Sequence, residues 1–193
     1  MNGHSAKRLL VVAVCLLVTL AAIALWLDRA GSTVVAPIGK SATELHEILA
    51  SPGVVYSSKF MALDGNRQAL GQWDRKLLIV NFWATWCGPC KEEMPILVRL
   101  QTKFSPQGLQ IVGIAADSSS NVSNFAKKVA INYPLLIDEA GAIEFSKRLG
   151  NRLGLLPHTV MFAPGGEIIY NKLGIISENT LSDIIAKNVP IRH

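Results

Sequence analysis

Two cysteines separated by two residues are the strongest chemical signal in this chain of 193 residues. Cys87 and Cys90 flank Gly88 and Pro89, shortly after the apolar run Leu77 to Ala84. That run is typical of a strand covered on both faces, and helical spacing follows it, so the pair is predicted at a helix start. Free N–H groups and the positive end of a helix dipole stabilise a thiolate there. We therefore expect Cys87 to attack disulfides and Cys90 to resolve the mixed disulfide.

Two other interpretations of the cysteine pair fit the sequence less well. A structural zinc site needs four ligands, and the chain has neither a second CxxC motif nor paired histidines. A purely structural disulfide between Cys87 and Cys90 would close a very short loop and would restrict the unfolded chain little. We expect no metal site, and no cofactor besides a redox-active disulfide formed by these two residues.

The N-terminal segment is predicted to be a membrane anchor. Residues 9–27 carry no charge, and as a helix they would span about 28 Å, close to the hydrocarbon thickness of a bilayer. A cleaved signal peptide is the alternative, but its apolar stretch is usually shorter. Lys7 and Arg8 precede the run, so the N-terminus should stay in the cytoplasm and the rest should be exported. Cys15 lies inside the run and is interpreted as structural.

Composition excludes several classes of partner. The chain has 50% hydrophobic residues and a formal net charge of +5, but the apolar excess and part of the charge belong to the first 31 residues. The remainder carries 16 basic and 13 acidic side chains. Such a small excess is not typical of a nucleic-acid-binding surface, so no nucleic-acid partner is expected.

The rest of the chain is predicted to be one α/β domain with a mixed sheet. Residues 31–53 read as a linker with a short helix near Leu45 to Leu49, and residues 54–193 as the domain. The domain should begin with a hairpin, Val54 to Leu63 and Asn66 to Leu70, joined by Asp64-Gly65. Further segments alternate between strand and helix patterns. Strands are expected at 109–116, 134–137, 159–162 and 167–173, and helices at 97–104, 122–129, 142–149 and from 177 onwards.

Four motifs resemble thioredoxin-like proteins, and more closely their membrane-anchored TlpA, ResA and CcmG branch. They are Leu63-Asp64-Gly65, the block NFWATWCGPCKEEMP from Asn81 to Pro95, Gly154 to Pro157, and the turn Pro164-Gly165-Gly166. The resemblance covers roughly residues 60 to 188. It implies a thioredoxin-like fold with an added helix and strand near 121–137. It also implies thiol–disulfide exchange by a single-pass protein of the bacterial inner membrane, with its catalytic domain in the periplasm.

The same resemblance implies a substrate-binding edge around the disulfide. Pro157 matches the proline that such folds hold in cis facing the active-site disulfide, which leaves the backbone of Leu156 free to pair with a substrate strand. Trp86 should form an apolar lip for the substrate, next to Gly88 and Pro89. The bland alternative for Pro157 is an ordinary proline at the start of a strand.

His158 departs from the residue expected after this proline. A histidine beside Cys87 could stabilise its thiolate, or it could help Cys87 and Cys90 bind Cu(I). An inert, exposed imidazole is the other possibility.

Glu93 lies three residues after Cys90, on the same face of the predicted helix. In the TlpA-like branch an acid at this position is associated with proton management and substrate contact. Ordinary thioredoxins bury an acid six residues before the first cysteine, where this chain has Asn81, whose amide cannot titrate. We predict that Glu93 assists deprotonation of Cys90; the alternative is a solvated charge on the helix surface.

The sequence leaves three functions open. In the first, an anchored dithiol reduces disulfides of exported proteins, such as apocytochromes c awaiting haem or copper-site proteins of a respiratory oxidase, and a membrane electron donor recharges it. In the second, the protein is an oxidase that introduces disulfides, although Gly-Pro between the cysteines resembles reducing thioredoxins. In the third, it delivers copper through Cys87, Cys90 and His158.

Overall fold

The computed structural model describes residue 47 and residues 50–189. The predicted anchor, residues 9–27, lies outside this part of the chain, and of the predicted short helix near Leu45 to Leu49 only Glu47 is described. Among the helices that are described, none is both long enough and apolar enough to cross a bilayer.

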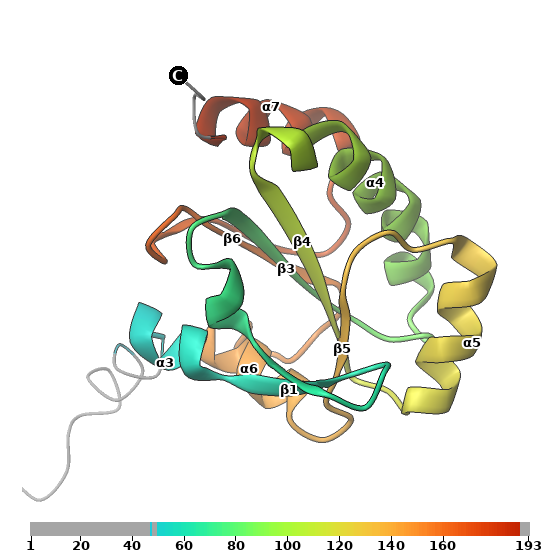
Figure 1. The fold of residues 1–193 in the computed structure, drawn as a ribbon. Coiled ribbons are helices and arrows are strands. Elements are labelled where there is room, and N and C mark those ends of the chain that lie inside the picture. The colour runs from blue at the N-terminus through green and yellow to red at the C-terminus, as the bar shows by residue number, and fades with distance from the viewer. Residues whose placement is uncertain (1–46, 48–49, 190–193) are drawn as a thin grey trace, which may run out of the picture. The chain divides into compact units, whose positions relative to one another are not determined.

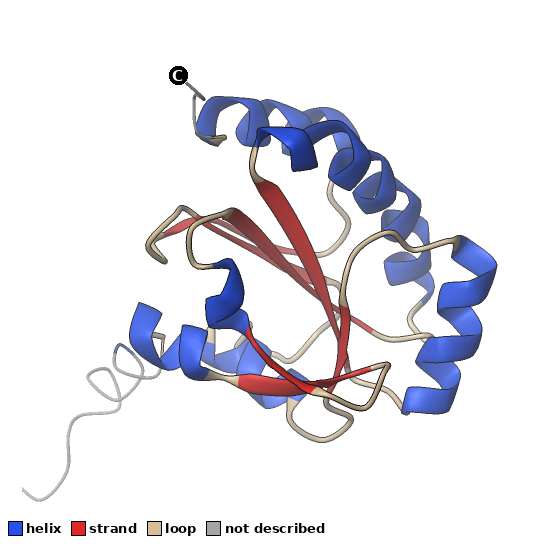
Figure 2. Ribbon diagram, in the orientation of Figure 1, coloured by secondary structure: helices blue, strands red, loops and turns tan. Residues whose placement is uncertain are grey.

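One mixed sheet organises the domain, as predicted (Figure 2). Its seven strands lie in the order β2-β1-β5-β4-β3-β6-β7. Its three central strands, β3, β4 and β5, run parallel to one another. On one side β1 pairs antiparallel with β5 and β2 with β1, and on the other side β6 pairs antiparallel with β3 and β7 with β6. The strands are β1 (Lys59–Ala62), β2 (Arg67–Ala69), β3 (Leu77–Trp83), β4 (Leu109–Ala115), β5 (Leu135–Ile137), β6 (His158–Phe162) and β7 (Ile168–Leu173).

Helices cover both faces of this sheet (Figure 1). On one face lie α4 (Gly88–Phe104), α5 (Ser119–Val129) and α7 (Glu178–Asn188). On the other lie α3 (Pro52–Ser57) and α6 (Ala142–Arg148), with the short 3-10 helix η1 (Leu70–Trp73). A second 3-10 turn, η2 (Ser105–Gln107), follows α4. The helix–strand insertion that the resemblance implied is α5 followed by β5.

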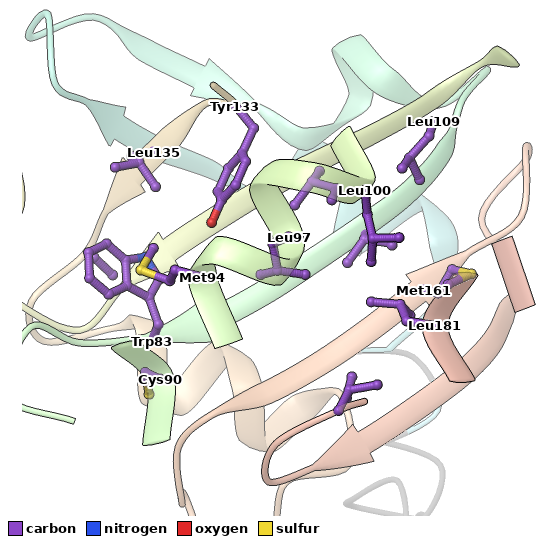
Figure 3. Close-up of a cluster of buried hydrophobic side chains, with 14 of the residues drawn as sticks. Trp83, Cys90, Met94, Leu97, Leu100, Leu109, Tyr133, Leu135, Met161 and Leu181 are labelled. Carbon is purple, nitrogen blue, oxygen red and sulfur yellow. The ribbon is translucent and has the colours of Figure 1, made fainter. Parts of the chain in front are cut away.

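Strand β3 joins the two cores because all seven of its side chains are buried. Leu77, Ile79 and Trp83 face α4, whereas Leu78, Val80 and Phe82 face α6. Figure 3 shows the α4 side, where Met94 and other side chains of the helix pack against the sheet. Burying one such side chain contributes about 1.5–3 kcal/mol, so this packing fixes where α4 begins relative to the end of β3.

The predicted first strand of the hairpin, from Val54, was partly wrong, because residues 52–57 form helix α3. Pro52 occupies the first helical turn, where its missing N–H is harmless and its φ suits a helix. The β-branched residue Val55 is fully buried in the α6-side core. Packing therefore outweighs its preference for a strand. The hairpin itself is present but shorter, as β1 and β2.

The turn between β6 and β7 provides a test of how firmly α3 is docked. Gly165 and Gly166 both have positive φ, +93° and +97°, but a Cβ at Gly166 would lie 2.6 Å from Pro52 Cβ and 2.9 Å from Tyr56 Cε2. Among the residues that the structure describes, a Cβ at Gly165 would meet no atom within 4 Å.

We expect Gly165→Ala to lower the free energy of unfolding by about 1 kcal/mol through backbone strain alone. Gly166→Ala should cost about 1–3 kcal/mol more, because α3 must move. Urea unfolding of the two variants measures the difference. Equal losses of unfolding free energy in the two variants would mean that α3 can move aside with no loss of stability.

Candidate active site

A disulfide joins Cys87 and Cys90 at the junction of β3 and α4, with an S–S distance of 2.03 Å. Cys87 is the N-cap of α4, and its Sγ accepts a hydrogen bond from the backbone N–H of Cys90 at 3.2 Å. The first turn of α4 contains no acidic residue. The exposed fraction is 6% for Cys87 and 1% for Cys90. Cys87 is thus the more exposed residue of the pair, and its position at the helix N-terminus favours negative charge on its sulfur.

The loop before β6 lies at the same edge of the sheet as the disulfide. The antiparallel register pairs Phe82 near the end of β3 with His158 at the start of β6, so residues after β3 and residues before β6 meet there. The Leu156–Pro157 peptide bond is cis, as the resemblance implied. The carbonyl of Pro157 accepts from the N–H of Gly174, just beyond β7, at 2.8 Å.

Loops at this edge expose apolar side chains. Trp86 is 68% exposed, immediately before the disulfide. Leu153 and Leu155 in the loop before β6 are also exposed, as is Ile175 after β7. We call these four residues the apolar rim.

The remaining predicted substrate-binding residues lie beside the apolar rim. Gly88 and Pro89 form the exposed start of α4. Leu156 is half-buried and packs against both cores.

Glu93 is buried beneath the surface of α4 and is not a solvated charge. Its Oε2 accepts a hydrogen bond from Asn81 Nδ2 at 3.0 Å. Its Oε1 has no hydrogen-bond partner among the described residues. Burial raises the pKa of the Glu93 carboxyl from 4.5 to about 7, although the Asn81 amide partly opposes this shift. A group with this pKa can exchange a proton near neutral pH.

Sequence reasoning missed how Glu93 is held. The β3–β6 register pairs Asn81 with Thr159, and Asn81 Nδ2 also donates to Thr159 Oγ1 at 2.9 Å. Asn81 therefore links the helix carboxylate to β6 instead of serving as the titrating group itself.

Tyr133 was also not predicted as a site residue from the sequence. Its hydroxyl is buried without a partner among the described residues, and it points toward the core around Met94 (Figure 3). Burial and the Glu93 carboxylate raise the pKa of Tyr133.

Asp117, just after β4, holds the loop that leads to the disulfide. Its Oδ2 accepts from the backbone N–H and the hydroxyl of Thr85, and its Oδ1 accepts from Ser118 N–H and Asn121 Nδ2. Burial alone would raise the pKa of Asp117, but these hydrogen bonds hold it below its usual value. The charged carboxylate therefore joins the active-site loop to the start of α5. Nothing in the spacing of the sequence indicated this contact.

His158 lies elsewhere than either sequence interpretation placed it. The imidazole is 1% exposed and stacks on Phe82, on the sheet face covered by α6 rather than the face of α4 and Glu93. Its two ring nitrogens are hydrogen-bonded to Ser146 and Asn171. It is therefore not an exposed imidazole, and its nitrogens are not directed at the disulfide. In the described part of the chain, no group of three His, Cys, Asp or Glu side chains could hold a metal ion.

Comparison with known proteins agrees with this geometry. Residues 39–186 match the family model for Redoxin. The thiol-disulfide oxidoreductase ResA of Bacillus thuringiensis subsp. konkukian is 31% identical over 129 residues, which cover 66% of this chain and 72% of that protein.

Two solved structures are similar as well. A thioredoxin-related protein of Neisseria meningitidis serogroup B has 35% identity and a TM-score of 0.60, covering 67% of this chain and 97% of that one. A thiol:disulfide interchange protein of Chlorobium tepidum has 27% identity and a TM-score of 0.63, covering 70% and 95%. With its thioredoxin-like fold and its disulfide at the start of α4, the chain belongs to the Redoxin family as a ResA-like protein-disulfide reductase.

Proposed function

We propose that this reductase is held in the bacterial cytoplasmic membrane by residues 9–27 and that its domain faces the periplasm. There it reduces disulfides of exported proteins that carry cysteine pairs, with apocytochromes c and copper-site proteins as the candidate clients. A thiol-transfer donor in the membrane returns the electrons. The uncharged run with Lys7 and Arg8 before it supports the topology, and the resemblance to the TlpA, ResA and CcmG branch supports the client class.

The observation that carries the reaction is the unequal placement of the two sulfurs. Cys87 caps α4 beside the exposed Trp86, whereas Cys90 lies one turn further into the helix and is almost fully buried. A client can reach the first sulfur from the apolar rim. The second sulfur is placed to act only within the protein.

Reduction then proceeds in two balanced steps. The Cys87 thiolate attacks one sulfur of the client disulfide, which forms a mixed disulfide and releases a client thiolate. Cys90 next loses its proton, with Glu93 as the acceptor, and attacks the Cys87 sulfur. This releases the second client thiolate, and the protein is left with the Cys87–Cys90 disulfide. The client has gained two electrons, and the donor dithiol restores them to the protein as it is itself oxidised.

The apolar rim and the cis-Pro157 loop supply the client contact in this proposal. The loop before β6 stands at the sheet edge opposite the end of β3, so a client strand lying along Leu156 would bring its disulfide to Cys87. Leu155 and Trp86 would cover apolar client side chains on either side.

Trapping tests this function in the cell envelope. A full-length Cys90→Ser variant should stall as a mixed disulfide on Cys87, so that exported cysteine-pair proteins co-purify with it from membranes under non-reducing conditions and are released by dithiothreitol. The matched control is the Cys87→Ser/Cys90→Ser double variant, which should capture none. Recovery of cytoplasmic proteins alone, or of the variant in the soluble fraction, would contradict the proposed location.

A further inference from the structure

A chain of buried polar side chains lies under the loop of residues 151–157, on the α6 face of the sheet. His158 is at its centre, stacked on the Phe82 ring with centroids 5.5 Å apart and an interplanar angle of 17°. Ser146, from α6, is fully buried, and Asn151 is 2% exposed. None of these side chains takes part in the cysteine chemistry described above, so their arrangement needs a separate explanation.

Asn171, on β7, ends this series of hydrogen bonds and fixes which atom donates in each of them. Asn171 Nδ2 donates to the Leu149 carbonyl at 2.6 Å, so Asn171 presents Oδ1 to His158 Nε2, 2.8 Å away. An amide oxygen only accepts, and Nε2 must therefore carry a hydrogen. In the neutral ring Nδ1 is then an acceptor, and it receives the Ser146 hydroxyl hydrogen at 2.8 Å. Burial lowers the pKa of His158, which favours this neutral form.

The other end of the chain holds the backbone of the loop. Asn151 Nδ2 donates to Ser146 Oγ at 2.8 Å and to the Leu155 carbonyl at 2.7 Å. Asn151 Oδ1 accepts from the Leu155 N–H at 3.2 Å. One side chain thus binds both backbone groups of Leu155, two residues before Pro157. The side chain of Leu155 remains 53% exposed as part of the apolar rim.

We propose that His158 is a positioning residue, which, as the Nε2–H tautomer, holds the loop of residues 151–157 in its client-binding conformation through Ser146 and Asn151. This inference rests on the proposed function, in which that loop contacts the client. With this tautomer, both ring nitrogens of His158 and the polar side-chain atoms of Ser146 and Asn151 have a matching donor or acceptor. With the hydrogen on Nδ1 instead, two donors would face each other at Ser146 unless its hydroxyl turned away, and two acceptors would face each other at Asn171.

The tautomer itself is a direct readout. Nitrogen-15 chemical shifts of the His158 ring should show a hydrogen on Nε2 and an unprotonated Nδ1 at pH 7. The signals are assigned by their loss in His158→Gln. A hydrogen on Nδ1 would overturn the proposal. The shifts are measured on the wild-type protein, and only the assignment of the signals uses the variant.

Ser146→Ala tests the link between the imidazole and the loop. We expect the KM for reduction of insulin to rise about fivefold, the effect of one lost hydrogen bond, with kcat within about twofold of wild type. Alkylation of Cys87 by iodoacetamide should keep its wild-type rate, because this small reagent does not need the loop. An unchanged KM would overturn the proposal. So would an equal loss of rate in insulin reduction and in alkylation of Cys87.

Asn151→Ala supplies a second variant and a coupling measurement. It breaks the chain at the loop and should raise the KM at least as much as Ser146→Ala. The double variant should be no worse than Asn151→Ala alone, because both changes act on one chain. Additive effects would show that Ser146 does not act through Asn151. If the proposed envelope clients were wrong, trapping would fail, whereas wild type and variants would still differ on insulin.

Discussion

A Cys87→Ser variant is expected to lose at least about 10³-fold of its disulfide-reductase activity while keeping its fold. The Cys87 sulfur caps α4, accepts the Cys90 N–H and has no acidic residue in the first helical turn beside it. Cys90, at 1% exposure, cannot replace it as the attacking group. Serine preserves the cap but not the nucleophile, because its hydroxyl is not ionised at neutral pH. Insulin reduction with dithiothreitol as donor measures the loss.

Cys90→Ser is the matched control for this experiment. In that variant Cys87 should still be alkylated by iodoacetamide at a rate within about tenfold of the reduced wild type, because the helix N-terminus is unchanged. Net reduction should nevertheless stop at the mixed disulfide. If Cys90 were alkylated before Cys87 in the reduced wild-type protein, the assignment of the attacking sulfur would be reversed.

Glu93→Gln is expected to remove the fall in stability that this buried carboxyl causes between about pH 4.5 and 7. Below this window the carboxyl is protonated in both the folded and the unfolded protein. As the pH rises through it, the unfolded chain loses the proton while the buried group, with its pKa raised to about 7, retains it. The contribution of Glu93 to the free energy of unfolding should therefore fall by up to about 3 kcal/mol across the window. Above about pH 7 this loss of unfolding free energy is complete.

Gln keeps the size of the side chain and an oxygen for the Asn81 amide, so the variant should be the more stable protein at pH 8 by up to about 3 kcal/mol. Urea unfolding of the oxidised proteins measures this without interference from the thiols. Glu92→Gln is the matched control: it removes the same charge from the next, exposed position of α4 and should leave the profile unchanged. A parallel profile for Glu93→Gln and wild type would contradict a buried, titrating carboxyl.

The same substitution should weaken the resolving step. Without a proton acceptor near Cys90, release of the mixed disulfide at pH 7 should slow by about 10²-fold, and the pH dependence of Cys90 alkylation in the reduced protein should change. Attack by Cys87 should be spared. An unaltered pH dependence of Cys90 reactivity would remove Glu93 from the mechanism.

Much of the fold follows from local patterns. The run from Leu77 to Ala84 could only be buried on both faces, and the structure places alternate side chains of β3 in two cores. Helices α4 and α5 follow from apolar residues at helical spacing. The α3 segment shows where this reasoning ends, since Val55 favours a strand locally but is buried in a helix against distant parts of the chain.

The site divides in the same way. The CxxC motif could be predicted because it is compact in sequence and specific in type, whereas the cis-Pro157 followed only from the family resemblance. Asn81 could not be connected with Thr159, because only the register of β6 against β3 brings these residues, 78 positions apart, together. Its contact with Glu93 depends on how α4 packs on β3. His158 did carry a usable signal: it directly precedes the strand expected at 159–162, and in the structure it opens β6, whose five residues are all buried. A polar ring there must find partners inside the protein.

The position of β5 in the sheet has a consequence for how this domain can be altered. In the described part of the chain, the hairpin of β1 and β2 is paired to the rest of the sheet only through β5, and β5 is half of the inserted helix–strand unit. Excising residues 119–137 to obtain a minimal domain would not merely trim a loop. It would detach the hairpin and leave β4 as an open edge, able to pair with another copy of itself. The insertion therefore connects the N-terminal hairpin to the strands that carry the active site.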